Sequence, residues 1–156
     1  PGAGNVEKEK IPEFGVEPPE SGLEAASRWI DEDYAAETAE EILHNLEARV
    51  EKEPENELAA KALKALRRNS PTGMKTALEG LARAADQSLA ETLIQDFRTS
   101  GNALFAHDMA EGIRAQVIDK DRNPQWQPQA LEDVDRELVL SFFGPVPGYD
   151  DLQLPR

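Results

Sequence analysis

From Ser21 onward, the apolar residues of this chain recur every three or four positions, which is the spacing of one face of an α-helix. No stretch of four or more residues alternates cleanly between apolar and polar side chains, as a half-buried strand would. We therefore predict an all-α fold, a small domain of six to seven helices. The predicted helices cover 22–33, 39–52, 56–68, 71–85, 89–106, 109–118 and 135–143.

Capping residues precede several of these helices. A Ser, Thr or Asp followed by Glu three residues later forms a capping box, in which each side chain satisfies a free backbone N–H of the first turn. Such pairs are Thr38 and Glu41, Ser88 and Glu91, and Asp108 and Glu111. The dipeptide Ser70-Pro71 predicts another helix start, since proline is tolerated at the first helical position.

Two predicted helices carry a continuous apolar stripe. Because a helix stripe is normally buried against another element, we assign both stripes to the core. The first consists of Ala39, Ile42, Leu43, Leu46 and Val50, and the second of Met74, Ala77, Leu78, Leu81 and Ala85.

The chain divides into three parts by composition. Residues 1–20 hold four prolines and three glycines and predict an irregular arm, residues 21–143 form the helical domain, and residues 144–156 predict an exposed tail. Since the first residue is Pro1 rather than Met, we expect a fragment of a longer protein. Acidity is uneven, because residues 1–57 hold 17 acidic and 5 basic residues, a net charge of −12.

Charge and cysteine content exclude several functions. The formal net charge of −14 disfavours nucleic acid and anionic membranes as partners, because such partners bind mainly through Lys and Arg. The chain has no cysteine, so it holds no disulfide or thiolate metal site, and we expect a reducing, cytoplasmic location. No apolar run reaches the roughly 18 residues of a membrane span.

Residues that could perform chemistry are few. Neither His44 nor His107 has a second ligand at metal-binding spacing, so we assign both to the surface or to capping and expect no metal. The chain has no nucleophile elbow and no glycine-rich phosphate loop. We therefore predict no catalytic residue and no cofactor bound by this chain alone.

A cluster of cations near the end of the predicted helix 109–118 has two interpretations. Arg114, Lys120 and Arg122 could offset the negative end of the helix dipole, or they could contact the phosphates of an anionic ligand. Asp119 and Asp121 lie between them in sequence, and we expect these acids to compete for the charge of Lys120 and Arg122.

Two further residues predict local packing. Gly112 lies within a predicted helix, where glycine costs about 1 kcal/mol relative to alanine, so we expect another group to pack on its bare backbone. Trp126 lies between Pro124 and Pro128 in an irregular segment, 119–131. We expect a rigid strap with the indole ring buried and its N–H bound to an acceptor.

Several strings together resemble the carboxyl-terminal region of 3-hydroxyisobutyryl-CoA hydrolases, in the enoyl-CoA hydratase/isomerase (crotonase) superfamily. The most specific is E-G-x-R-A-x-x-I-D-K-D-x-x-P-x-W over 111–126, and the resemblance covers roughly 25–143. The supporting strings are S-P-T-G-M-K-T-A-L over 70–78, S-L-A-E over 88–91, Q-D-F-R over 95–98 and H-D-M-A over 107–110.

The resemblance implies a parent enzyme, an acyl-CoA thioester hydrolase of valine degradation. In this family the β-spiral core, the oxyanion donors and the catalytic carboxylates lie upstream of the matched region, so we expect the chain alone to be inactive. The terminal helices of the family cover the active site and build subunit contacts. The implied partners are therefore the crotonase core, the acyl-CoA substrate and a second copy in a homo-oligomer, with Lys120 and Arg122 contacting the CoA phosphates.

Two alternatives stay open. The parent could be an enoyl-CoA hydratase or isomerase, because the choice of reaction depends on residues outside this segment. The chain could also be a free-standing helical interaction module, whose acidic residues 1–57 recruit a basic partner.

Overall fold

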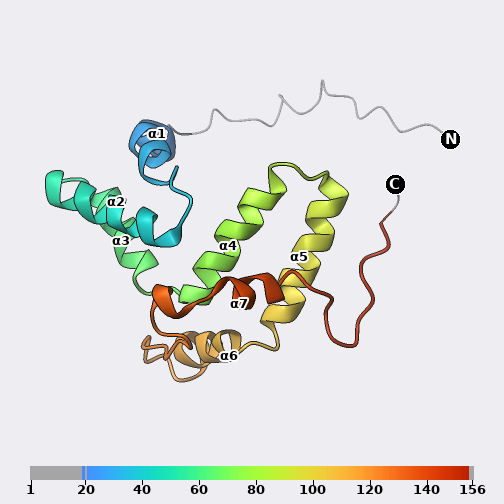
Figure 1. The fold of residues 1–156 in the computed structure, drawn as a ribbon. Helices are drawn as coiled ribbons and strands as arrows, with labels where there is room; N and C mark the ends of the chain where they lie inside the picture. Colours follow the sequence, from blue (N-terminus) through green and yellow to red (C-terminus); the bar gives the residue numbers. More distant parts are fainter. Residues whose placement is uncertain (1–18, 20, 155–156) are drawn as a thin grey trace. The chain divides into compact units, whose positions relative to one another are not determined.

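The structure, a computed structural model, describes residue 19 and residues 21–154 of the chain (Figure 1). This part forms seven α-helices and no β-strand, which confirms the predicted all-α class. The arm predicted over 1–20 lies, except for Pro19, outside the described residues. The helices are α1 (Gly22–Asp33), α2 (Ala39–Lys52), α3 (Glu57–Leu66), α4 (Pro71–Ala84), α5 (Leu89–Ala103), α6 (His107–Ile113) and α7 (Arg136–Ser141).

Side-chain caps explain why most helices begin where they do. The Ser88 hydroxyl accepts the Glu91 N–H, and a Glu91 carboxylate oxygen accepts the Ser88 N–H at 2.8 Å, so the predicted capping box is complete. Ser70 accepts the N–H of Gly73 at 2.9 Å ahead of Pro71. Such a cap contributes about 1 kcal/mol to helix stability. The other caps are Thr38 for α2, Asn56 for α3 and Asp135 for α7.

The chain divides into two compact units, one ending at Glu32 and one beginning at Asp33. The first unit contains α1 as far as Glu32, and the Ser21 hydroxyl accepts the Glu24 N–H in the first turn of this helix at 3.3 Å. The second unit contains α2 to α7 and the core described below.

The second unit has one group of buried residues where α2 packs against α3. The side chains of Leu46 and Ala59 are fully buried, and Ile42 and Leu63 are buried beside them. The apolar stripe predicted for residues 39–52 is thus confirmed as core. A second cluster lies around α7, where Val134, Val139, Phe142 and Phe143 pack together.

The stripe predicted for α4 is only partly in the core. Met74 and Leu78 are half-buried, but Ala77 and Ala85 are exposed and Leu81 is 72% exposed. Assigning this stripe to the core was therefore wrong for three of its five members. In Figure 1, α4 lies beside α5 and runs antiparallel to it, and α4 also contacts α2 and α7. These neighbours cover the flanks of α4 and leave the line from Gly73 through Ala77 to Leu81 open.

The segment after α7 is anchored to α5. Val146 is 5% exposed, and its side chain fills the space beside Gly101, while the Arg98 guanidinium pairs with the Asp151 carboxylate. The Asn102 amide donates to the carbonyl of Gly144 at 2.9 Å. The prediction of an exposed tail over 144–156 is therefore wrong at Val146, because a glycine on α5 provides the space that a valine side chain fills.

Candidate functional site

The helix that carries the recognised motif changes its winding partway. α6 ends at Ile113 and continues as a π-helical turn, Arg114–Ile118, before an extended segment that we call the strap, residues 119–130. Residue 106 precedes α6 and offers no side-chain cap. The predicted cap at Asp108 is therefore wrong, because Asp108 lies inside the helix.

Asp108 binds the strap instead of capping α6. One of its carboxylate oxygens accepts the Gln127 N–H at 2.9 Å, and the other accepts the Ser70 hydroxyl proton. The i, i+3 spacing of Asp108 and Glu111 that predicted a capping box also places both on one face of a helix. The shared helix face is what matters in the structure, since both carboxylates accept hydrogen bonds from donors that lie far away in sequence.

Glu111 accepts three donors. Its Oε1 accepts the backbone N–H of Gln125 at 2.7 Å, and its two oxygens accept Nε and Nη2 of Arg114, each at 2.8 Å. These hydrogen bonds, the guanidinium first and the Gln125 N–H second, lower the pKa of Glu111 to about 2. Glu111 therefore stays ionised and holds the strap at neutral pH.

Trp126 seats the strap on the helices. The ring is half-buried, and a Cβ placed on Gly112 would lie 3.3 Å from the indole Cη2. The indole Nε1 donates to the carbonyl of Arg68 at 2.9 Å. Two expectations are confirmed: a group packs on the bare backbone of Gly112, and the indole N–H has an acceptor. The expectation of a buried ring is met only in part, because Trp126 stays partly open to solvent.

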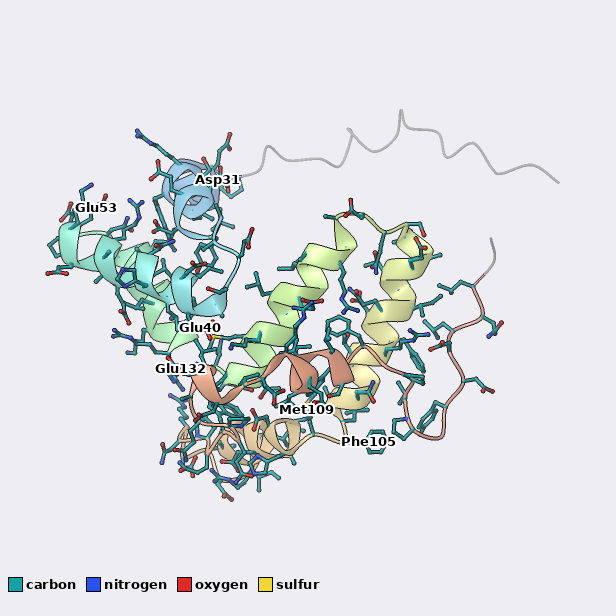
Figure 2. All side chains as sticks on the ribbon, in the orientation of Figure 1. Asp31, Glu40, Glu53, Phe105, Met109 and Glu132 are labelled. Carbon is teal, nitrogen blue, oxygen red and sulfur yellow. The ribbon has the colours of Figure 1, made fainter. Side chains whose placement is uncertain are left out.

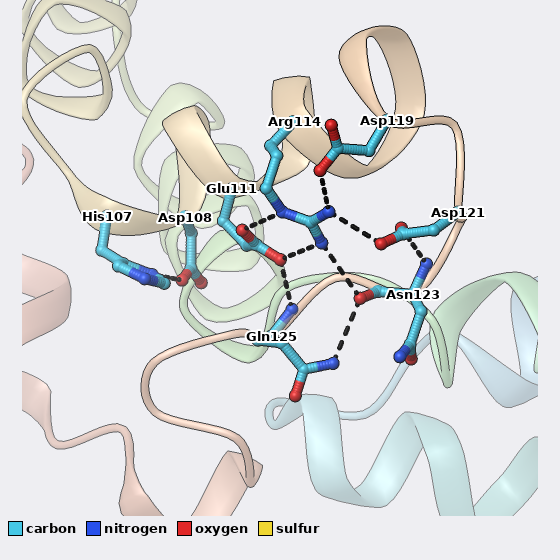
Figure 3. A network of polar contacts seen from close by, with 8 residues as sticks. All are labelled: His107, Asp108, Glu111, Arg114, Asp119, Asp121, Asn123 and Gln125. Carbon is cyan, nitrogen blue, oxygen red and sulfur yellow. Dashed lines mark hydrogen bonds and ion pairs between the residues drawn. The ribbon is translucent and has the colours of Figure 1, made fainter.

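Arg114 is the centre of a polar network (Figure 3). Its guanidinium forms a bidentate pair with Glu111, and its Nη1 lies 2.7 Å from a carboxylate oxygen of Asp119 and 2.7 Å from one of Asp121. Nη2 also donates to the carbonyl of Asn123 at 3.3 Å. The hydrogen bonds that the guanidinium donates to these three carboxylates, Glu111 first, raise the pKa of Arg114 above its ordinary value.

Lys120 and Arg122 lie on the turn that Arg114 holds. Both are exposed, and neither forms an ion pair within residues 21–154. Asp119 and Asp121 bind Arg114, so the expectation that these acids compete for the charge of Lys120 and Arg122 is wrong. The contact of the two cations with CoA phosphates stays a prediction.

The backbone at these two cations is unusual. Lys120 and Arg122 each have φ 56°, and among the described residues they are the only non-glycine positions with positive φ. A left-handed conformation costs an L-residue about 1–2 kcal/mol. The turn is closed by the Arg122 N–H, which donates to the Ala115 carbonyl at 3.0 Å.

The two histidines lie at the surface. His44 is exposed, and Nδ1 of His107 lies 3.1 Å from Asp108 Oδ1. The Ser70 hydroxyl also contacts Asp108 but is hydrogen-bonded to that carboxylate rather than to the imidazole, so these three residues do not form an activated serine. Within residue 19 and residues 21–154, no three His, Asp or Glu side chains gather closely enough to hold a metal ion. No helix in the same part is long and apolar enough to cross a bilayer.

Apolar surface is the feature that sequence reasoning missed. Gly73, Ala77 and Leu81, which we call the α4 ridge, separate two grooves: one of about 620 Å³ toward α5 and one of about 450 Å³ toward α2 and the strap. Both grooves are lined mainly by small and apolar side chains.

A second apolar strip runs from the end of α5 along α6. The members of this strip, which we call the apolar arm, are Phe105, Met109, Ile113 and Val117, and they are between 38% and 65% exposed. Phe105 and Met109 are labelled in Figure 2. The regular spacing of four residues could have revealed the arm, but spacing alone does not distinguish a buried stripe from an uncovered one.

Comparison with known proteins gives consistent results. Residues 5–143 match the family model described as enoyl-CoA hydratase/isomerase. The chain is 38% identical over 130 residues to 3-hydroxyisobutyryl-CoA hydrolase-like protein 5 of Arabidopsis thaliana, covering 81% of this chain and 33% of that protein. It is also 38% identical over 121 residues to the mitochondrial 3-hydroxyisobutyryl-CoA hydrolase of Gallus gallus, covering 78% and 30%. Small ribosomal subunit protein mS47 of A. thaliana is 31% identical, covering 96% and 39%.

Two crystal structures share the fold. A carnitinyl-CoA dehydratase from Mycobacterium thermoresistibile matches with a TM-score of 0.74 and 37% identity, covering 85% of this chain and 37% of that one. An enoyl-CoA hydratase from Rhodobacter sphaeroides matches with a TM-score of 0.73 and 39% identity, covering 84% and 37%. The resemblance predicted from the motif is confirmed. The chain spans about a third of the length of the curated relatives it matches.

Proposed function

The chain belongs to the enoyl-CoA hydratase/isomerase family, and from this premise we propose that it is the carboxyl-terminal helical segment of a 3-hydroxyisobutyryl-CoA hydrolase. In that role the segment covers the active site and contributes to contacts between subunits. The parent enzyme hydrolyses an acyl-CoA thioester of valine degradation, and its catalytic groups lie outside the 156 residues of this chain.

The observation that carries the proposal is the uncovered apolar surface. Monomeric soluble proteins rarely expose large contiguous apolar patches, and those that do commonly bind another protein surface. The α4 ridge and the apolar arm expose Leu81 and Phe105 at 72% and 65%. A crotonase core covering these residues would remove them from water and stabilise both parts, at roughly 25 cal/mol per Å² of apolar surface buried.

The proposed substrate contact lies on the turn after the π-helical residues. Lys120 and Arg122 are exposed cations without an ion-pair partner in the described part of the chain, and we propose that they contact the phosphates of CoA. The chain itself would supply no hydrolytic group. Released thiol, measured with 3-hydroxyisobutyryl-CoA and the purified chain, should therefore stay at the uncatalysed rate, and turnover by the chain alone would contradict this.

The docking role is tested by thermal melting at one fixed protein concentration. A ligand or domain that binds only the folded chain raises its Tm by mass action. We expect the crotonase core of a 3-hydroxyisobutyryl-CoA hydrolase, its β-spiral part (the β-core), to raise the Tm of this chain. Leu81→Asp should abolish the rise, because it places a carboxylate on the α4 ridge.

Leu58→Asp is the matched control, since Leu58 is an exposed leucine in the first turn of α3, outside the ridge and the arm. This variant should keep the Tm rise. A chain whose Tm does not respond to the core, or a Leu81→Asp variant that responds like the wild type, would contradict the proposed docking surface.

Two alternatives have support of their own. The crystal structures that share the fold are named as a dehydratase and a hydratase, which supports an enoyl-CoA hydratase or isomerase as the parent. The net charge of −12 over residues 1–57 and the similarity to a protein named as a ribosomal subunit component support a helical interaction module. A complex with a basic protein that weakens steeply with salt, formed without any crotonase core, would favour the module.

The compartment stays a prediction. The absence of cysteine supports the cytoplasm, whereas several relatives are named as mitochondrial proteins. Fractionation of cells expressing the parent gene separates the two locations.

A further inference from the structure

We propose that Arg114 is a positioning residue, which binds the acids of the turn and thereby presents Lys120 and Arg122 as a cation pair to the phosphates of CoA. The inference rests on the proposed function, because it concerns the same contact. It assigns to Arg114 a role different from that of the two cations: Arg114 shapes the site and does not touch the ligand.

The acids and bases of the turn have different partners. The segment from Asp119 to Arg122 alternates acid and base, and in a free loop each base would be offset by its neighbouring acids. Arg114 takes the direct ion pairs of both acids, because a carboxylate oxygen of Asp119 and one of Asp121 each lie 2.7 Å from its Nη1. The second oxygen of Asp121 is also used, since it accepts the Asn123 N–H at 2.9 Å.

The two cations share a left-handed backbone conformation. Strained backbone persists only where surrounding contacts hold it in place. Here the contacts are those of Arg114 on one side of the turn and the hydrogen bond from Arg122 to Ala115 on the other. Glycine would relieve the strain at both positions, yet long cationic side chains occupy them. A turn that merely connects two segments has no need of this arrangement.

Arg114 is itself held in place by other residues. Glu111 holds two of its nitrogens, and Glu111 is itself fixed by the Gln125 N–H of the strap. The Arg114 side chain is 32% exposed, and its guanidinium faces three carboxylates and one carbonyl, so its donors are occupied (Figure 3). An arginine so engaged is not available to a phosphate, which separates it from Lys120 and Arg122.

Nuclear magnetic resonance titration of the 156-residue chain tests the inference. We expect millimolar CoA to shift the backbone amide signals of residues 120 and 122, and pantetheine, which lacks the nucleotide phosphates, to leave them in place. The Asp121→Asn variant gives the decisive comparison. If net charge alone governed binding, losing one acid beside two cations would tighten the binding of CoA.

If Arg114 positions the cations, Asp121→Asn loosens the turn and weakens CoA binding at least threefold. Loss of the left-handed conformation should appear in the HN–Hα couplings of Lys120 and Arg122. Asp133→Asn is the control of equal charge change, because Asp133 is exposed and its carboxylate has no partner among the described residues. Arg114→Lys should also weaken CoA binding, since one ammonium group cannot replace the bidentate fork of a guanidinium.

The outcomes are distinguishable. Tighter or unchanged CoA binding by Asp121→Asn overturns the positioning role and leaves the CoA contact standing. A wild-type chain with no CoA-dependent shift overturns both the contact and the positioning role, and the melting experiment with the β-core then decides the proposed function separately.

Discussion

The Oε1 atom of Glu111 accepts the backbone N–H of Gln125 at 2.7 Å, and one helical turn away Asp108 accepts the N–H of Gln127 at 2.9 Å. Two backbone N–H groups of the strap, two residues apart, therefore donate to two carboxylates on one face of α6. Between them, Trp126 packs on Gly112 and donates to Arg68. The strap is therefore held on the helices by its backbone N–H groups and by one aromatic side chain.

Acid should release the strap through Glu111. The folded-state pKa of about 2 lies below the ordinary value of 4.5, so the stabilisation by ionised Glu111 is complete above pH 4.5 and is lost as the pH falls toward 2. We expect the amide proton of Gln125 to exchange faster across this window. Glu111→Gln, which keeps an acceptor oxygen but cannot titrate, should remove that dependence. An equal acid response in the variant would assign the effect to another carboxyl.

Two glycines within helices should respond oppositely to alanine. At Gly80 an added Cβ would lie 3.7 Å or more from its neighbours, so Gly80→Ala should stabilise the chain by up to about 1 kcal/mol through helix propensity. At Gly112 the Cβ would press on Trp126 at 3.3 Å, and the ring is held by its hydrogen bond. We expect Gly112→Ala to show no gain or a net loss in urea unfolding. A similar gain at both positions would show that the ring moves freely.

Gly101 and Val146 should be strongly coupled. A Cβ at Gly101 would lie 2.6 Å from a Val146 methyl carbon, so Gly101→Ala should cost about 1–3 kcal/mol by overpacking. Val146→Ala in the same chain should recover much of that loss, because it removes the clashing methyls. A double-mutant cycle of unfolding free energies measures the coupling. Additive effects would contradict the close contact between α5 and the segment after α7.

The indole hydrogen bond should be separable from the packing of the ring. Trp126→Phe keeps an aromatic side chain over Gly112 but loses the donor to the Arg68 carbonyl, and we expect a cost of about 1 kcal/mol or more. The amide protons at the end of α3 should exchange faster in this variant. Trp29→Phe offers a control with the same substitution in the other compact unit.

Local sequence rules were reliable where the partners of a residue lie within one turn. Ser70, Thr38 and Ser88 cap the helices they were predicted to cap, because each capped N–H group is three residues away. The same rule failed at Asp108 and Glu111, which accept backbone N–H groups of the strap and the Ser70 hydroxyl proton from 14 to 38 residues away, besides the guanidinium of nearby Arg114. Spacing shows which side chains share a helix face but does not show which donors reach that face.

The sequence by itself determined the all-helical class, the starts of most helices, the need of Gly112 and Trp126 for packing partners, and the family. These properties follow from the helical period, from short-range hydrogen bonds and from a motif read residue by residue. Only the tertiary structure decided which apolar stripe is covered, where Val146 lies, and that Arg114 rather than Lys120 or Arg122 takes the acids of the turn. Burial and charge pairing depend on distances between segments far apart in the chain, and no local pattern encodes those distances.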